Sequence, residues 1–135
     1  MKKLLGCLLL LALSVAIPLT VGCVPALVGV GAAASGGGTY VYLNGTLTAE
    51  YQAPFEKVWE ATERTVAEMH GTDVAPTKDI SHGKIEAVIE GQKVIFKIDY
   101  HAKNVTKLAV RVGVLGDRLA AHRLHDKVGE NLKKI

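Results

Sequence analysis

Two histidines near the C-terminus, His122 and His125, lie three residues apart and are followed by Asp126. Histidines at this spacing on a helix can bind the same zinc ion. At about 100° per residue, His125 lies roughly 70° and His122 roughly 130° from the centre of the apolar side of the predicted helix. Both histidines are therefore expected on a solvated side, and the sequence supplies no further ligand. We predict no metal site, and no loss of stability when glutamine replaces both histidines.

A second group of acidic and histidine residues is spread over predicted strand ends and turns. These residues are Asp79, His82, Asp99 and His101. In such positions they are typically turn formers or solvated pairs. The sequence also lacks a nucleophile elbow, a phosphate-binding loop and the CxxC and HExxH motifs. We therefore predict that the protein is not an enzyme and uses no cofactor.

Five residues of the predicted strands are candidates for a binding interface on the outer face of the sheet. They are Tyr40, Tyr42, Lys97, His101 and Arg111. Tyrosine and arginine are enriched in protein interfaces. The same residue types also occur on solvated sheet faces that bind nothing, and the sequence does not separate these two interpretations.

The remaining residue with distinctive chemistry is Cys23, near the end of an apolar N-terminal segment. Two lysines precede an apolar run over residues 4–17, and Gly22 stands directly before Cys23. This order resembles a secretion signal that ends in a bacterial lipobox, where the cysteine thiol receives a diacylglycerol before cleavage. We predict a signal peptide at 1–22, followed by a lipidated Cys23 and a glycine-rich tether at 23–38. An uncleaved membrane anchor and plain secretion are the alternatives.

Lipid on Cys23 would hold the protein on a membrane, since each buried methylene contributes about 0.8 kcal/mol. The next residue is Val24 and not aspartate, which resembles an outer-membrane sorting signal of enteric bacteria. We therefore predict a lipoprotein of the cell envelope. The outer membrane, with the protein facing the periplasm, is favoured over the inner membrane.

Length and charge limit the partners further. The 135 residues are enough for one domain. The 16 basic residues fall to 14 once the two lysines of the predicted signal are removed, against 13 acidic residues. This near balance leaves no basic surface of the kind that binds nucleic acid.

The periodicity of residues 39–135 predicts a domain of strands and helices. Apolar residues at alternate positions of 41–49 indicate one strand with a single buried face. A helix is predicted from Pro54 to about Gly71, with Trp59 on its apolar side.

The second half of the domain is predicted to contain more strands and a final helix. A short segment around Val74 precedes a β-hairpin with its turn at Gly91-Gln92, and another strand follows Asn104. Asp117 is the expected N-cap of the last helix, whose apolar side comprises Ala121, Leu124, Val128, Leu132 and Ile135. We predict an α+β fold in the order strand, helix, strands, helix. It is a two-layer sandwich, with a mainly antiparallel sheet of four to five strands and two helices packed on one face.

Five stretches of the domain also form a recognisable combination. They are 39–47, 54–69, 77–79, 91–94 and 106–117, and Arg111-Val112-Gly113 with Gly116-Asp117 is the sharpest part. Together they resemble a family of short bacterial lipoproteins whose shared domain has no assigned function. The resemblance implies a lipoprotein that faces the envelope, and it implies no catalytic residue.

Two functions compete on these grounds. The favoured hypothesis is a non-enzymatic module, anchored to a membrane through lipid on Cys23, that binds an envelope protein or a cell-wall component. The alternative is a periplasmic domain that binds a small molecule or a metal, with His122 and His125 as its best candidates.

Overall fold

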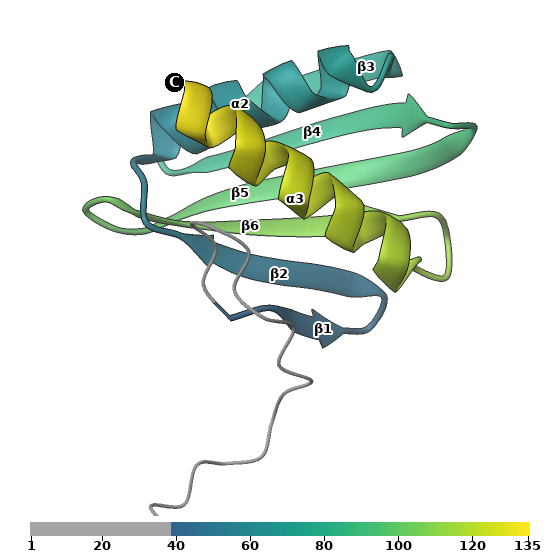
Figure 1. The fold of residues 1–135 in the computed structure, drawn as a ribbon, viewed down its shortest axis with the longest axis horizontal. Coiled ribbons are helices and arrows are strands. Elements are labelled where there is room, and N and C mark those ends of the chain that lie inside the picture. Colours follow the sequence, from purple (N-terminus) through teal and green to yellow (C-terminus); the bar gives the residue numbers. More distant parts are fainter. Residues whose placement is uncertain (1–38) are drawn as a thin grey trace, which may run out of the picture.

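The computed structural model describes residues 39–135, which form one sheet and two helices (Figure 1). The predicted signal peptide, Cys23 and the tether lie outside the described residues. None of the described helices is long and apolar enough to cross a membrane. In chain order the elements are β1 (Val41–Leu43), β2 (Thr46–Tyr51), α2 (Phe55–Glu68), β3 (Thr72–Lys78), β4 (His82–Ile89), β5 (Gln92–Ala102), β6 (Val105–Val112) and α3 (Arg118–Lys134).

The six strands form one antiparallel sheet in the order β1-β2-β6-β5-β4-β3. The predicted α+β class and antiparallel sheet are confirmed, but the predicted count of four to five strands is wrong. The segment around Val74 is a full strand, β3. In addition, a turn at Asn44-Gly45 divides the predicted first strand into β1 and β2. These two residues have φ of 50° and 81°, the left-handed values that a two-residue hairpin turn requires.

Both helices pack on the same face of the sheet and contact each other (Figure 1). α2 lies over β4, β5 and β6, whereas α3 lies over β6 and β2. Burial alternates along β2, β4 and β6, as expected for strands with one face covered. We call the face under the helices the inner face and the opposite one the outer face.

Trp59 of α2 is buried against the sheet, as predicted. Its ring lies directly over Gly83 in β4, where a Cβ atom would come within 2.4 Å of a ring carbon. A glycine is therefore required beneath the indole. Asp117 is the N-cap of α3, also as predicted, because its carboxylate accepts a hydrogen bond from the Ala120 backbone N–H at 2.9 Å.

Replacement Trp59→Ala should lower the free energy of unfolding by roughly 3–5 kcal/mol, because it leaves a cavity between α2 and the sheet. Urea unfolding of the purified protein measures this loss. The control is Glu63→Ala, an exposed position on the same helix, which should change stability by less than about 0.5 kcal/mol. Equal stability of the two variants would contradict this packing of α2.

Candidate functional site

Three of the five predicted interface residues, Lys97, His101 and Arg111, lie on the outer face of the sheet. Lys97 pairs with Ala109 in register, and Arg111 pairs with Thr46. The imidazole of His101 reaches the carboxylate of Glu50, also on the outer face, with Nε2 and Oε1 3.7 Å apart. Neither α2 nor α3 covers these side chains, so this face is open to a partner.

Two carboxylates on the outer face, Glu86 and Glu50, are each shared between neighbouring cations. The two oxygens of Glu86 lie 2.9 Å from Lys84 Nζ and 3.0 Å from Lys93 Nζ. Hydrogen bonds from Lys84 and then Lys93 lower the pKa of the Glu86 carboxyl below its ordinary value. Glu50 is shared in the same way by Lys107, at 3.6 Å, and by His101. Exposed pairs of this kind contribute little stability, but they neutralise the carboxylates of Glu86 and Glu50.

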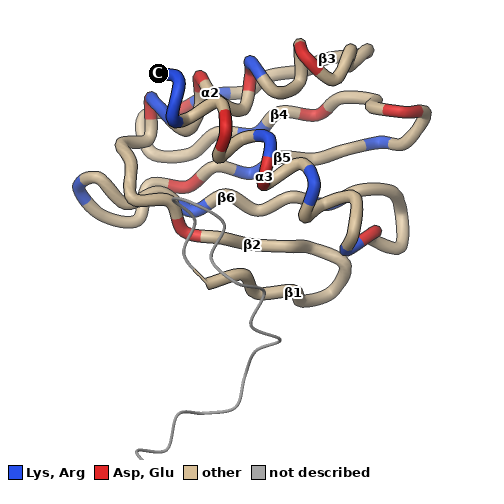
Figure 2. The backbone as a smooth tube through the Cα atoms, in the orientation of Figure 1, with Lys and Arg blue, Asp and Glu red and all other residues tan. Residues whose placement is uncertain are grey.

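Lys97 is a cation of this face that has no carboxylate partner in the described part of the chain. It stands directly opposite Lys84 in the β4–β5 register, and residues 39–135 provide no ion pair for its ammonium group. Like charges directly opposite each other destabilise a sheet. On the outer face of β2, β6, β5 and β4 the cations Lys84, Lys93, Lys97, Lys107 and Arg111 outnumber the carboxylates Glu50, Glu86 and Asp99 (charged positions are coloured in Figure 2).

The two opposed lysines line a shallow depression of about 250 Å³ between β3, β4 and β5. His82 and Asp99 also line it and are paired with each other, with 2.8 Å between Nδ1 and Oδ1. We expected such residues to be turn formers or solvated pairs, and both of these side chains are well exposed. The lining also contains Asp79, and Lys84 is already paired with Glu86, so Lys97 is the ammonium group of this depression that has no carboxylate partner among residues 39–135.

Lys84 is not among the predicted site residues, and the turn of its hairpin lies one residue earlier than the sequence predicts. The turn is formed by Glu90 and Gly91, with φ of 50° and 77°, and not by Gly91-Gln92. A turn at Glu90-Gly91 sets Lys84 opposite Lys97. The left-handed preference of glycine at the second turn position was the signal that could have located this pair.

Arg111 acts mainly within the molecule. Its Nη1 donates a hydrogen bond to the Asn44 carbonyl at 2.8 Å, and its Nη2 donates to the Val114 carbonyl. The guanidinium thereby joins the β1–β2 turn to the loop that precedes α3. A partner that bound Arg111 would have to compete with these two carbonyl groups.

Tyr40 and Tyr42 lie on the inner side of the sheet, so their predicted place on the outer face is wrong. Tyr40 is buried, with its ring 4.6 Å from that of His122 and 5.3 Å from that of His125. The Tyr42 hydroxyl donates a hydrogen bond to the Gly116 carbonyl at 3.1 Å. Burial, and after it the nearby Asp126 carboxylate, raise the pKa of Tyr40 above its ordinary value.

The two-residue turn is the physical reason for this error. Alternation along one continuous strand would place Val41 on the same face as Leu47. The Asn44-Gly45 turn instead pairs Tyr42 with Leu47 and Val41 with Thr48. Residues that pair directly share a face, so Tyr42 follows the buried Leu47 and Val41 follows the outward Thr48.

His125 is fully buried, so its predicted place on a solvated side of α3 is also wrong. The buried arc of the helix is flanked by two polar residues, His125 and Asn131. His125 faces β2, whereas Asn131 faces α2 and donates to Thr65 Oγ1 at 3.0 Å. Each polar flank is buried because a neighbouring element covers it, which the helix periodicity alone does not reveal.

The His125 imidazole is hydrogen-bonded at both nitrogens. Nε2 lies 2.8 Å from the Leu47 carbonyl oxygen, which only accepts, so Nε2 carries the proton and donates. Nδ1 is then an acceptor, and the single proton of the Tyr51 hydroxyl is shared between Nδ1 and the His125 carbonyl oxygen, each 3.0 Å away. Burial lowers the pKa of His125 to about 4, and burial raises that of Tyr51.

This arrangement counts against a metal site that includes His125. His125 could bind a cation only by breaking its interior hydrogen bonds. His122 is half-buried and lies 3.3 Å from Asp126, between Nδ1 and Oδ2, while the other Asp126 oxygen is buried with no hydrogen-bond partner in the described chain. Over residues 39–135 no group of three or more His, Cys, Asp or Glu side chains is placed to hold a metal ion.

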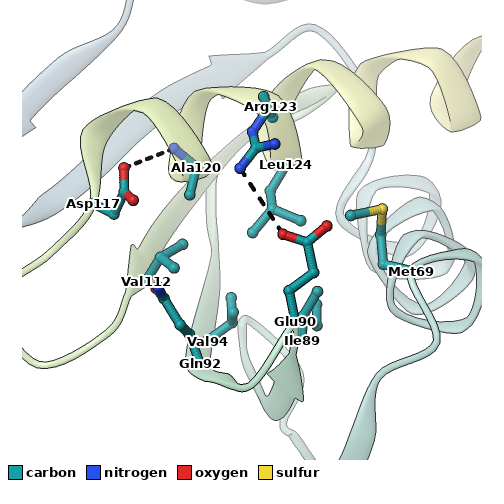
Figure 3. Close-up of a pocket in the computed structure, with 10 residues that line it drawn as sticks. All are labelled: Met69, Ile89, Glu90, Gln92, Val94, Val112, Asp117, Ala120, Arg123 and Leu124. Atoms are coloured by element: carbon teal, nitrogen blue, oxygen red, sulfur yellow. Dashed lines mark hydrogen bonds and ion pairs between the residues drawn. The ribbon is translucent and has the colours of Figure 1, made fainter.

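A second cavity, of about 100 Å³, lies between α3, the end of α2 and the β4–β5 turn (Figure 3). Figure 3 shows Arg123 and Glu90 pointing toward each other across its mouth, with nitrogen and oxygen 3.9 Å apart. Its volume is well below the roughly 300–1,000 Å³ of a typical small-molecule site. The walls are mainly apolar and comprise Ile89, Val94, Val112 and Leu124.

Comparison with known proteins identifies a sequence family but no characterised relative. Residues 6–131 match the family described as "Protein of unknown function (DUF3568)". No curated protein matches the chain.

The buried imidazole predicts a loss of stability in acid. Above a pH of about 6.5 His125 is neutral in both the folded and the unfolded state. As the pH falls from about 6.5 to 4, the unfolded chain binds a proton that the folded state excludes. The free energy of unfolding should therefore fall by up to about 3 kcal/mol more than carboxylate titration alone explains. Urea unfolding at a pH of about 7 and of about 4.5 measures the difference.

His125→Gln should reduce this extra acid sensitivity while lowering stability at neutral pH by about 1–3 kcal/mol, because the Tyr51 hydroxyl and the Leu47 carbonyl lose well-placed partners. This replaces the expectation of unchanged stability. His82→Gln, at an exposed histidine, is the control and should keep the acid sensitivity. The same acid sensitivity in the wild type and in His125→Gln would show that His125 does not titrate as described.

Proposed function

We propose that this chain, which belongs to the DUF3568 family of proteins of unknown function, is a lipid-anchored, non-enzymatic binding module of the bacterial cell envelope. Lipid on Cys23 would hold it on a membrane, with the outer membrane favoured. Its folded domain would bind an envelope protein or a cell-wall component through the outer face of the sheet. The bound group would carry carboxylates or phosphates.

The N-terminal sequence supports the anchor. Lys2 and Lys3 precede an apolar run, and Gly22 precedes Cys23 as in a lipobox. Cys7 falls within the predicted signal, so Cys23 would be the single cysteine of the mature protein. An acylated Cys23 would leave that protein with no free thiol.

The opposition of Lys84 and Lys97 is the observation that carries the binding proposal. Both ammonium groups stand on a sheet face that the helices leave open, and they line one depression. A pair of like charges in register costs stability; Glu86 offsets part of this cost at Lys84, and an anion beside Lys97 would lower it further. Lys84 has a carboxylate partner in Glu86 and Lys97 has none among residues 39–135, which supports Lys97 as the contact for an anionic partner.

The competing hypothesis of a small-molecule or metal site has less support. His125 is engaged inside the domain by Leu47 and Tyr51. The cavity beside Arg123 is smaller than typical metabolite sites. We therefore keep the interaction module as the proposed function.

The anchor is tested by Cys23→Ser, which should abolish labelling of the protein by a radioactive or clickable fatty acid in growing cells. The variant should accumulate as an unprocessed precursor or as a soluble form, because the acyl acceptor is missing. Cys7→Ser is the matched control and should be labelled as the wild type is. Equal labelling of wild type and Cys23→Ser would rule out this anchor.

The binding face is tested by a photo-crosslinking residue at Ile95, two positions from Lys97 on the same face of β5. Crosslinking in intact cells should yield a defined adduct that Lys97→Glu reduces several-fold and Lys97→Arg retains. Lys57→Glu, an exposed lysine of α2, is the matched control and should leave the adduct unchanged.

The same Lys97→Glu variant should be slightly more stable than the wild type, by roughly 0.2–1 kcal/mol, because it places a carboxylate opposite Lys84. Lost crosslinking together with increased stability would separate binding from folding. An adduct that survives Lys97→Glu, or that Lys57→Glu removes equally, would contradict the proposed face.

A further inference from the structure

Large apolar side chains are exposed around one corner of the domain, on the outer face of β1, on the loop 113–117 and on the first turn of α3. This apolar corner comprises Val41, Leu43, Val114, Leu115 and Leu119, which are between 53% and 91% exposed. The loop and the β1–β2 turn are held against each other backbone to backbone. A Cβ atom on Gly116 would lie 2.3 Å from the Cα atom of Gly45, so the loop that carries two of these side chains is fixed on the β-hairpin.

The surroundings of the apolar corner contain little charge, and what they contain is mainly positive. No charged residue occurs over 39–49 or 113–116. Asp117 caps α3 by accepting a backbone hydrogen bond. The guanidinium of Arg118 lies over the Tyr42 ring, 5.8 Å from its centre. An apolar tip with an arginine beside it can place its side chains among lipid headgroups while the cation stays near the phosphates.

The chain that leads from the predicted lipid to the domain enters at β1, beside Val41 and at the opposite end of this short strand from the β1–β2 turn. β1 is the first element of the domain, and 15 residues, 24–38, separate Cys23 from Thr39. Even fully extended, these residues span only about 50 Å. A surface tethered this closely meets the membrane at a high effective concentration, so a weak apolar contact is sufficient to hold it there.

We infer that the apolar corner docks into the headgroup region of the membrane that holds the lipid anchor, with Leu43 and Leu115 inserted and Arg118 at the lipid phosphates. This inference rests on the proposed lipid anchor and adds an orientation of the domain. Lys97 stays free for a partner, because β5 lies three strand spacings from β1, about 14 Å away. A bilayer fits better than a second copy of the chain, since β1 offers only three residues for edge-to-edge pairing.

The test uses the full-length lipidated protein in vesicles of phosphatidylethanolamine and phosphatidylglycerol. A fluorescent thiol label is placed on Leu115→Cys or, as a matched control, on Lys97→Cys, since the acylated Cys23 does not react. Quenching is measured with aqueous iodide and with brominated lipids. We expect the label at position 115 to be several-fold less accessible to iodide than the label at 97, and to be quenched by brominated lipid. Leu43→Ser with Leu119→Ser should restore access of iodide to position 115.

Equal access of iodide to the two labels would overturn the docking. So would a label at 115 that is shielded from iodide but not quenched by brominated lipid, since a second copy, a partner or the tether would then cover it. The intact mass of the same preparation reports the acyl chains on Cys23. A cleaved chain without acyl groups would overturn the proposed anchor and the docking with it, whereas an acylated chain with an exposed label would overturn the docking alone.

Discussion

The hydrogen bonds of a buried imidazole hold the C-terminal helix on the sheet. His125 donates to the Leu47 carbonyl and approaches the Tyr51 hydroxyl, so α3 is tied to β2 at two points. An unsatisfied polar group at this depth would cost about 1–3 kcal/mol. These bonds therefore favour one rotation of the helix about its axis. That rotation turns Asn131 toward α2 and seats Leu124 and Val128 in the core.

The position of α3 in turn fixes β1, the edge strand at which the chain enters the domain. Its first residue, Arg118, stands over Tyr42 of β1, and the preceding loop is bonded to the β1–β2 turn through Arg111. β1 has a single neighbour in the sheet, β2, and three residues give it few backbone hydrogen bonds of its own. These side-chain contacts hold β1 in place. They also fix the positions of the exposed leucines that lie nearest the proposed anchor.

The two surfaces that we propose for function follow from one asymmetry of the fold. Two helices cover one face of a six-stranded sheet and leave the other face to solvent or to a partner. Charged residues collect on that open face, where Lys97 and Lys84 oppose each other. Apolar residues are exposed instead at the β1 edge. A domain anchored beside β1 would hold one surface at the membrane and present the other, several strands away, to the envelope.

The sequence alone determined the fold class, the apolar sides of both helices, the cap at Asp117 and the outward position of Lys97. These features depend on local periodicity and on chemistry within a few residues, which a single sequence contains. Only the tertiary structure decided the faces of Tyr40 and Tyr42, the register of Lys84 and the burial of His125. The first three depend on hairpin turns, where a shift of one residue reverses or displaces every pairing. Burial at the flank of a helix depends on which distant element packs there. For His125 that element is β2, whose Tyr51 precedes His125 by 74 residues.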